Sequence, residues 1–214
     1  MALSAGVPGR TVRVEQGAIA GIVLFAVALV LRISGAFELS DGELVIIAVR
    51  LAVPLLIFRY WLVGGIAAML IDGADVILID ALGLGGFGTH YAELDKLLDS
   101  YYLSIECLVA WRAWSQPWAR NTALALFMFR LVGVVLFETL DARVILFIFP
   151  NLFENWWLYC VAVVKFWPRL VPHDRRTTLV PLVLLLVPKM GQEYLLHFAE
   201  AKPWNWTKEH VLGQ

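Results

Sequence analysis

The chain has 214 residues and a net charge of −1, and 60% of its residues are hydrophobic, 13% aromatic and 16% charged. Its mean hydropathy is +0.75. Soluble domains average about 45–50% apolar and about 25% charged residues. One small core cannot hide this much apolar surface, so we expect a lipid bilayer to cover most of it. The near-neutral charge, without a basic face of interleaved aromatic residues, excludes nucleic acid as a partner.

Seven apolar runs of about the length that crosses a bilayer follow one another along the chain. They cover residues 17–33, 44–62, 62–81, 94–114, 121–140, 143–164 and 179–198. We predict an all-α, polytopic membrane bundle of six or seven helices over 17–199, between a cytoplasmic segment 1–16 and an aromatic tail 200–214. The first run is either a retained anchor, which we favour, or a cleaved signal peptide, because small residues follow it.

Turn residues and tryptophans mark the ends of these runs. Arg59-Tyr60-Trp61, followed by two glycines, predicts a hairpin between the second and third runs. Glycines over 83–88 form a link before the fourth run, and Pro168 and Pro172 separate the last two. Because tryptophan favours the headgroup level, most of the tryptophans are expected to form an interfacial belt. Cys107 and Cys160 lie inside apolar runs without metal-site spacing, which predicts buried thiols.

The basic residues predict the orientation, since Lys and Arg of short loops stay in the cytoplasm. With seven spans, one side holds Arg10, Arg13, Arg59, Arg112, Arg120, Lys165, Arg169, Arg175 and Arg176. The other side holds Arg32, Lys96, Arg143, Lys202 and Lys208. This predicts a multi-pass protein with its N-terminus in the cytoplasm and its C-terminus outside. The loop between Asp80 and Asp95 then also lies outside.

Four carboxylates in two neighbouring runs form the main candidate site. Asp72 and Asp75 are three residues apart and Asp95 and Asp99 are four apart, so each pair shares one helix face. Converging carboxylates need a cation or protons, and oxygen ligands suit hard ions such as Mg²⁺ or Mn²⁺. The alternative for Asp95 and Asp99 is a solvated first helical turn, where acidic residues favour the helix dipole.

The spacing of these carboxylates resembles the CDP-alcohol phosphotransferase family, whose pattern is D-x2-D-G-x2-A-R-x8-G-x3-D-x3-D. The resemblance covers roughly residues 45 to 105, and Arg50 in the preceding run is also similar to the family. It implies that Asp72, Asp75 and Asp95 hold two divalent cations on the diphosphate of a CDP-linked donor. It further implies that Asp99 is the general base for an acceptor alcohol.

The sequence departs from the family pattern at several positions. Val76 stands in place of the glycine, Ile79 in place of the alanine and Asp80 in place of the arginine. Tyr91 occupies the position of the second glycine, and the gap between the two acidic pairs is two residues longer. CDP-linked substrates are cytoplasmic, whereas the basic residues place the loop between the two pairs outside.

Further charged residues lie in the last three runs. Arg130 cannot lose its charge, so it requires a carboxylate, a phosphate or water. We expect it to pair with Glu154 across an antiparallel hairpin. Glu106, the Asp72/Asp75 pair and a phosphate-binding role stay the alternatives. Pro150 is expected to break the sixth run, as in transporters with discontinuous helices. In the seventh run, Glu193 is expected to pair with His197 on one face.

These features leave three functions open. The first is a metal-dependent phosphotransferase-like enzyme with a lipid or nucleotide-linked substrate, the second a small transporter or ion-handling protein. The third is a structural subunit of a larger membrane complex, and a homo-oligomer also stays open.

Overall fold

The computed structural model describes residues 19–27, 40–81, 91–140, 142 and 144–195; of 75, 76, 78–81 and 91–93 it describes the backbone only. Within these ranges the chain is helical and has no strand, which confirms the all-α prediction. The described residues divide into two compact units. We call the residues up to Ala113 the N-terminal unit and those from Trp114 the C-terminal unit. The termini, including segments 1–16 and 200–214, lie outside the described residues.

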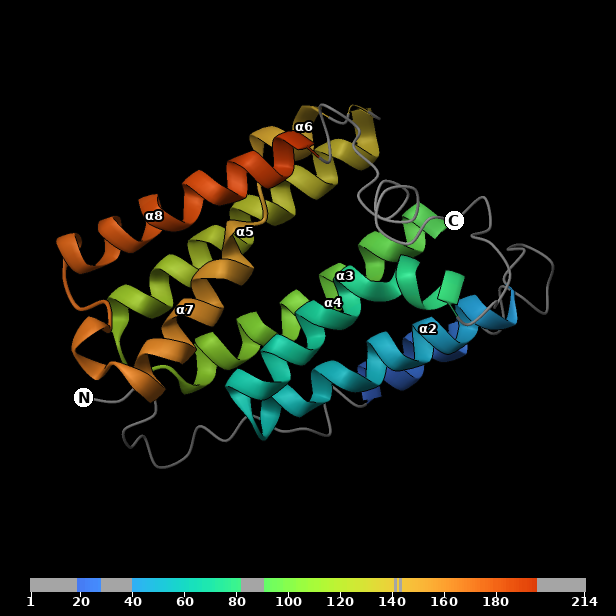
Figure 1. Cartoon of the computed structure of the whole chain (residues 1–214), viewed down its shortest axis with the longest axis horizontal. Coiled ribbons are helices and arrows are strands. Elements are labelled where there is room, and N and C mark those ends of the chain that lie inside the picture. Colours follow the sequence, from blue (N-terminus) through green and yellow to red (C-terminus); the bar gives the residue numbers. More distant parts are fainter. Residues whose placement is uncertain (1–18, 28–39, 82–90, 141, 143, 196–214) are drawn as a thin grey trace. The chain divides into compact units, whose positions relative to one another are not determined.

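The N-terminal unit contains a helical segment over 19–27 and four named elements (Figure 1). These are α2 (Asp41–Ala52), the 3-10 helix η1 (Val53–Phe58), α3 (Trp61–Ala81) and α4 (Tyr91–Ala113). Arg59 and Tyr60 separate η1 from α3, so the predicted turn at this place is confirmed. The turn is tight: a Cβ atom at Gly64 would lie 2.4 Å from the backbone nitrogen of Ile57. Glycine at this position therefore lets α3 pack directly on η1.

The run 44–62 is not the continuous helix that its composition predicts. α2 begins earlier, at Asp41, because Ser40 and Glu43 form a capping box: each side chain accepts a hydrogen bond from the other residue's backbone N–H. The α-helix ends at Ala52 because Pro54 has no N–H to donate to the carbonyl of Arg50 and its ring crowds that carbonyl. The α-helical part is therefore 12 residues long, short of the ~20 that a membrane span needs.

The C-terminal unit contains α5 (Pro117–Leu140), α6 (Val144–Ile148), α7 (Leu152–Phe166), the 3-10 helix η2 (Pro168–Leu170) and α8 (Arg175–Glu193). The predicted sixth run is divided at Phe149–Asn151, which confirms the expected break at Pro150. Gly133 of α5 lies against this break, where an added Cβ would meet the side chain of Phe149 at 2.2 Å.

Among the residues that the structure describes, two segments are long and apolar enough to cross a membrane, Pro117–Leu140 and Val144–Phe166. The apolar window of the first segment is 11% buried and that of the second 56%, so the first alone lacks the burial of a soluble protein's core helix. Its buried residues are the small Ala119, Ala123 and Gly133. Small residues inside and large apolar residues outside are the arrangement expected of a helix in lipid. Two spans by this measure are fewer than the six or seven that the sequence predicts.

The tryptophans divide between the interior and the surface of the C-terminal unit. Trp114, Trp156 and Trp157 are at most 1% exposed, so the prediction that they form an interfacial belt is wrong. The Trp156 indole donates to the carbonyl of Ala119 (3.1 Å), and the Trp114 and Trp157 rings lie 6.0 Å apart. They are core residues because they line the packed contact between α5 and α7. Trp118 and Trp167 are exposed, as the belt requires.

Candidate functional site

The candidate site is a cluster of one guanidinium and three carboxylates in the N-terminal unit. α2 supplies Arg50, α3 supplies Asp72, and α4 supplies Asp95 and Asp99. Arg50 belongs to the buried face of α2, which includes Glu43, Ile46, Ile47 and Leu51 at helical spacing. Its side chain is therefore directed into the unit and not to the surface.

The guanidinium of Arg50 contacts all three carboxylates. Its Nη1 donates to Oδ1 of Asp95 at 2.5 Å, and its Nη2 donates to Oδ1 of both Asp72 and Asp99. One oxygen from each of the three aspartates lies within 4.8 Å of the others. The structure thus brings together three of the four aspartates that the sequence singles out, and Arg50 lies among them.

Burial and charge are unevenly distributed over the cluster. The side chain of Arg50 is 3% exposed, whereas those of Asp72, Asp95 and Asp99 are 27%, 37% and 26% exposed. One guanidinium offsets one of three carboxylates, so the four groups carry a formal charge of −2. The buried side of the cluster is positive and its accessible side is negative. A cation that approaches from the accessible side would meet the partly exposed carboxylates.

Asp75, the fourth aspartate of the predicted site, is placed only by its backbone, and so is Asp80, which stands in place of the arginine of the family pattern. Asp75 and Asp80 lie on α3, and their side chains are outside the described residues. Asp72 contacts Arg50 inside the unit, as an acid within an apolar helix requires. The corresponding prediction for Asp75 stays a prediction.

The surroundings of Arg50 are closely packed. A depression beside it is lined by the apolar residues Val53, Pro54, Ala68 and Ile71, together with Asp72 and Tyr102, and is too narrow for a water molecule. The hydroxyl of Tyr101 donates to the carbonyl of Leu51 (3.1 Å) and ties α4 to the end of α2. A substrate would therefore reach the carboxylates from their exposed side and not through this depression.

The charged residues of the C-terminal unit contact the two helix ends at the break. Nη1 of Arg130 donates to the carbonyl oxygen of Phe149 (3.0 Å), which follows the last residue of α6. The prediction that Arg130 pairs with Glu154 is wrong, because the break exposes a backbone carbonyl within its reach. Glu154 instead accepts a hydrogen bond from the side-chain amide of Asn151 (3.1 Å).

Two residues of α8 complete this arrangement. The carboxylate of Glu193 accepts from the backbone N–H of Asn151 (3.3 Å), just before α7, and pairs with the ammonium of Lys189 (3.2 Å). Lys189 and Glu193 are at most 8% exposed. His197, the expected partner of Glu193, lies outside the described residues. These charges act as caps for the interrupted helix, since they satisfy backbone groups that Pro150 leaves without helical partners.

Sequence reasoning missed these two capping roles and the direct contact of Arg50 with the carboxylates. The i, i+4 spacing of Lys189 and Glu193 could have identified their pair. The capping of the break depends on contacts between helices and has no signal in the sequence. Comparison of the chain with families of known proteins, with curated proteins and with solved structures finds no match.

Proposed function

We propose that this chain is a multi-pass membrane protein with a divalent-cation-dependent, phosphotransferase-like activity that uses a CDP-linked donor and an alcohol acceptor. The observation that carries the proposal is the convergence of Asp72, Asp95 and Asp99, from two helices, with one oxygen each within 4.8 Å. Ligands at about 2.0–2.6 Å from one ion lie no more than about 4–5 Å apart. The donor set is all oxygen, which fits Mg²⁺ or Mn²⁺.

The charge of the cluster supports one cation per chain. Arg50 and one divalent cation together would balance the formal charges of Asp72, Asp95 and Asp99. Asp72 and Asp95, with Asp75 where its side chain reaches, would hold the cation. When bound, it would neutralise the diphosphate and stabilise the charge that develops during displacement.

The residues of the chain have separate roles in this proposal. Asp99 takes the proton of the acceptor hydroxyl, whose oxygen forms a new bond to phosphorus while the phosphoanhydride bond of the donor breaks. Arg50 holds Asp99 and Asp95 in place through its hydrogen bonds to both carboxylates. Arg130 belongs to the C-terminal unit and already binds the Phe149 carbonyl, so the proposal rests on the N-terminal unit alone.

The test measures the binding of Mn²⁺ to the purified full chain in detergent by electron paramagnetic resonance. We expect one Mn²⁺ per chain, and Asp95→Asn should weaken its binding by at least about tenfold. Asp41→Asn is the matched control, because Asp41 is an exposed acid of the same unit outside the cluster. Release of CMP from a CDP-linked donor should depend on Mn²⁺ and on Asp99. Absence of Mn²⁺ binding would overturn the proposal.

The orientation of the loop 82–90 gives a second test. Three segments separate it from the basic loop after α7: α4, α5 and the interrupted pair α6 and α7. If each crosses the membrane, the two loops face opposite sides. The enzyme needs the loop 82–90 in the cytoplasm, so a single cysteine at Thr89 should be protected from an impermeant reagent added outside intact cells. Labelling from outside would contradict a cytoplasmic substrate.

A transporter or ion-handling protein is the second candidate function. The observation that favours it is the interrupted helix at Phe149–Asn151, with Arg130 and Glu193 on its two ends. Discontinuous helices with charged residues at the break occur at transporter substrate sites. Ion flux across the membrane of proteoliposomes that depends on Glu193 but not on Asp95 would favour the transporter over the enzyme.

A further inference from the structure

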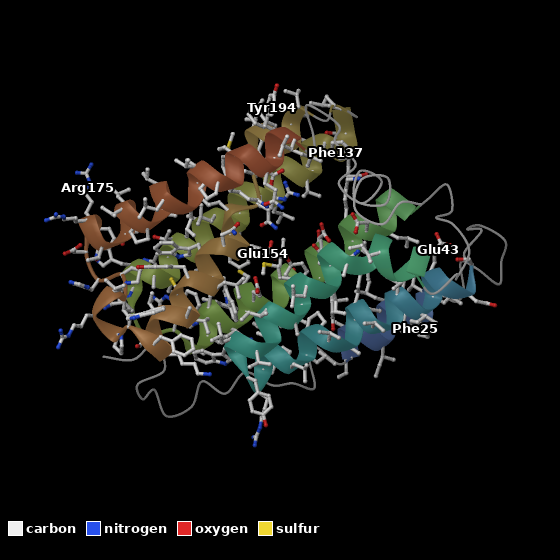
Figure 2. The ribbon with its side chains drawn as sticks, in the orientation of Figure 1. Phe25, Glu43, Phe137, Glu154, Arg175 and Tyr194 are labelled. Atoms are coloured by element: carbon white, nitrogen blue, oxygen red, sulfur yellow. The ribbon has the colours of Figure 1, made fainter. Side chains whose placement is uncertain are left out.

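The end of α7, the loop that follows it and the start of α8 together carry a concentration of positive charge. Lys165, Arg169, Arg175 and Arg176 are all exposed within twelve residues. We call these four residues the basic patch. Figure 2 shows the side chain of Arg175 projecting away from the end of α8. The one acid of the loop, Asp174, is engaged as the N-cap of α8, where its Oδ1 accepts from the backbone N–H of Thr177 (2.7 Å).

Large apolar side chains are interleaved with these charges. Phe166, Trp167 and Leu170 are 54%, 60% and 51% exposed. The ammonium of Lys165 lies 5.4 Å from the centre of the Phe166 ring. Exposed aromatic residues beside basic residues are typical of a surface that meets both lipid headgroups and the upper part of the acyl chains. Water alone would leave the apolar side chains unfavourably exposed.

The loop is held in a defined conformation. Val171 and Pro172 are buried, and the hydroxyl of Tyr159 on α7 donates to the carbonyl of Leu170 (2.9 Å). The 3-10 helix η2 turns the chain between the end of α7 and Val171. The basic patch is therefore presented by an ordered loop, so a ligand would lose less conformational entropy on binding it than on binding a flexible tail.

The position of the loop follows from the helices on either side. α7 ends at Phe166, the last residue of the candidate span Val144–Phe166. α8 begins with the basic patch and then exposes an apolar face that includes Val183, Leu184 and Val187, while its charged Lys189 and Glu193 point inward and pair with each other. Figure 1 shows the end of α7 and the start of α8 at the same end of the C-terminal unit. The loop therefore lies where the chain leaves the hydrocarbon.

From these observations we infer that the basic patch binds the phosphate groups of anionic phospholipids in the leaflet that it faces, while Phe166, Trp167 and Leu170 insert beneath them. This inference rests on the membrane location in the proposed function, but not on the cation site. Guanidinium groups form paired hydrogen bonds with phosphate oxygens, which gives the three closely spaced arginines of the basic patch a chemical preference for this partner.

The test compares the lipids that contact the full chain after reconstitution into phosphatidylcholine bilayers. Spin-labelled phosphatidylglycerol and spin-labelled phosphatidylcholine are added separately, and the ratio of their association constants is measured. A basic residue near an anionic surface contributes on the order of a fivefold preference. We expect a ratio of roughly 3 to 10 for the native chain, reduced in 1 M salt because the charges are exposed.

The variant Arg169→Gln/Arg175→Gln/Arg176→Gln should lower the ratio toward one. The control Arg169→Lys/Arg175→Lys/Arg176→Lys keeps the three positive charges on the same surface and should leave most of the preference in place. An unselective native chain, or equal losses in the two variants, would overturn the inference. Failure of the native chain to enter the bilayer would instead refute the membrane location, so the two failures are distinguishable.

Discussion

Replacement of Arg50 by glutamine tests whether the carboxylate cluster depends on its resident guanidinium. The change leaves three aspartates within a few ångströms of one another without their shared counter-ion. Removal of one partner from a buried ion pair costs about 3–5 kcal/mol. Because the aspartates are 26–37% exposed and water screens part of their repulsion, we expect about 2–3 kcal/mol. For a chain of this size that lowers Tm by roughly 4–12 °C.

The assay is thermal unfolding of the full chain in detergent with EDTA, with Arg59→Gln as the control, since Arg59 is exposed and only stacks near the Tyr60 ring. Mn²⁺ should then restore stability to Arg50→Gln, by about 2.7 kcal/mol at a hundredfold excess over Kd. The variant should also bind Mn²⁺ more tightly than the native chain, because a competing cation is gone. An Arg50→Gln chain that is as stable as the control in EDTA would refute this account of the cluster.

Two further predictions concern local structure. Gly64→Ala should destabilise the chain by about 1–3 kcal/mol in denaturant unfolding, because the new Cβ would lie 2.4 Å from the Ile57 nitrogen. In the control Gly73→Ala on the same helix, the new Cβ meets nothing within 4 Å, and the change should stabilise the chain by about 0.5–1 kcal/mol. Equal effects of the two changes would contradict the packing of α3 on η1. Hydrogen bonds from Thr177 lower the pKa of Asp174, so its carboxylate stabilises α8 above the ordinary pKa near 4 and loses this effect as the pH falls through the lowered value. The Tm difference between the native chain and Asp174→Ala should therefore shrink in acid, and a difference that grows there would exclude this cap.

Much of the helical architecture can be predicted from the order of the residues. Apolar runs, the turn at Arg59 and the break at Pro150 all reflect local chemistry: hydropathy, chain reversal and a missing N–H. The α-helical end at Ala52 also follows from Pro54, although the apolar run continues past it. Composition alone therefore overestimates the length of this helix.

The partners of the charged residues could not be predicted in the same way. The spacing of Asp95 and Asp99 predicts a shared helix face, but not that Arg50 lies between them and Asp72. Arg130 provides the clearer example. Equal distance from a turn favours Glu154 as its partner, whereas the break offers a nearer backbone carbonyl at Phe149.

The sequence by itself determined that the described part of the chain is helical, where its helices turn or break, and which acids are candidates for a cation site. Those properties depend on residues close together in the chain. Only the tertiary structure decided which charges meet, that Trp114, Trp156 and Trp157 are core and not interfacial residues, and that Glu193 reaches the backbone of Asn151, 42 positions away. Such contacts depend on how helices pack, because a charge in a low-dielectric interior pairs with the nearest group that packing brings within reach.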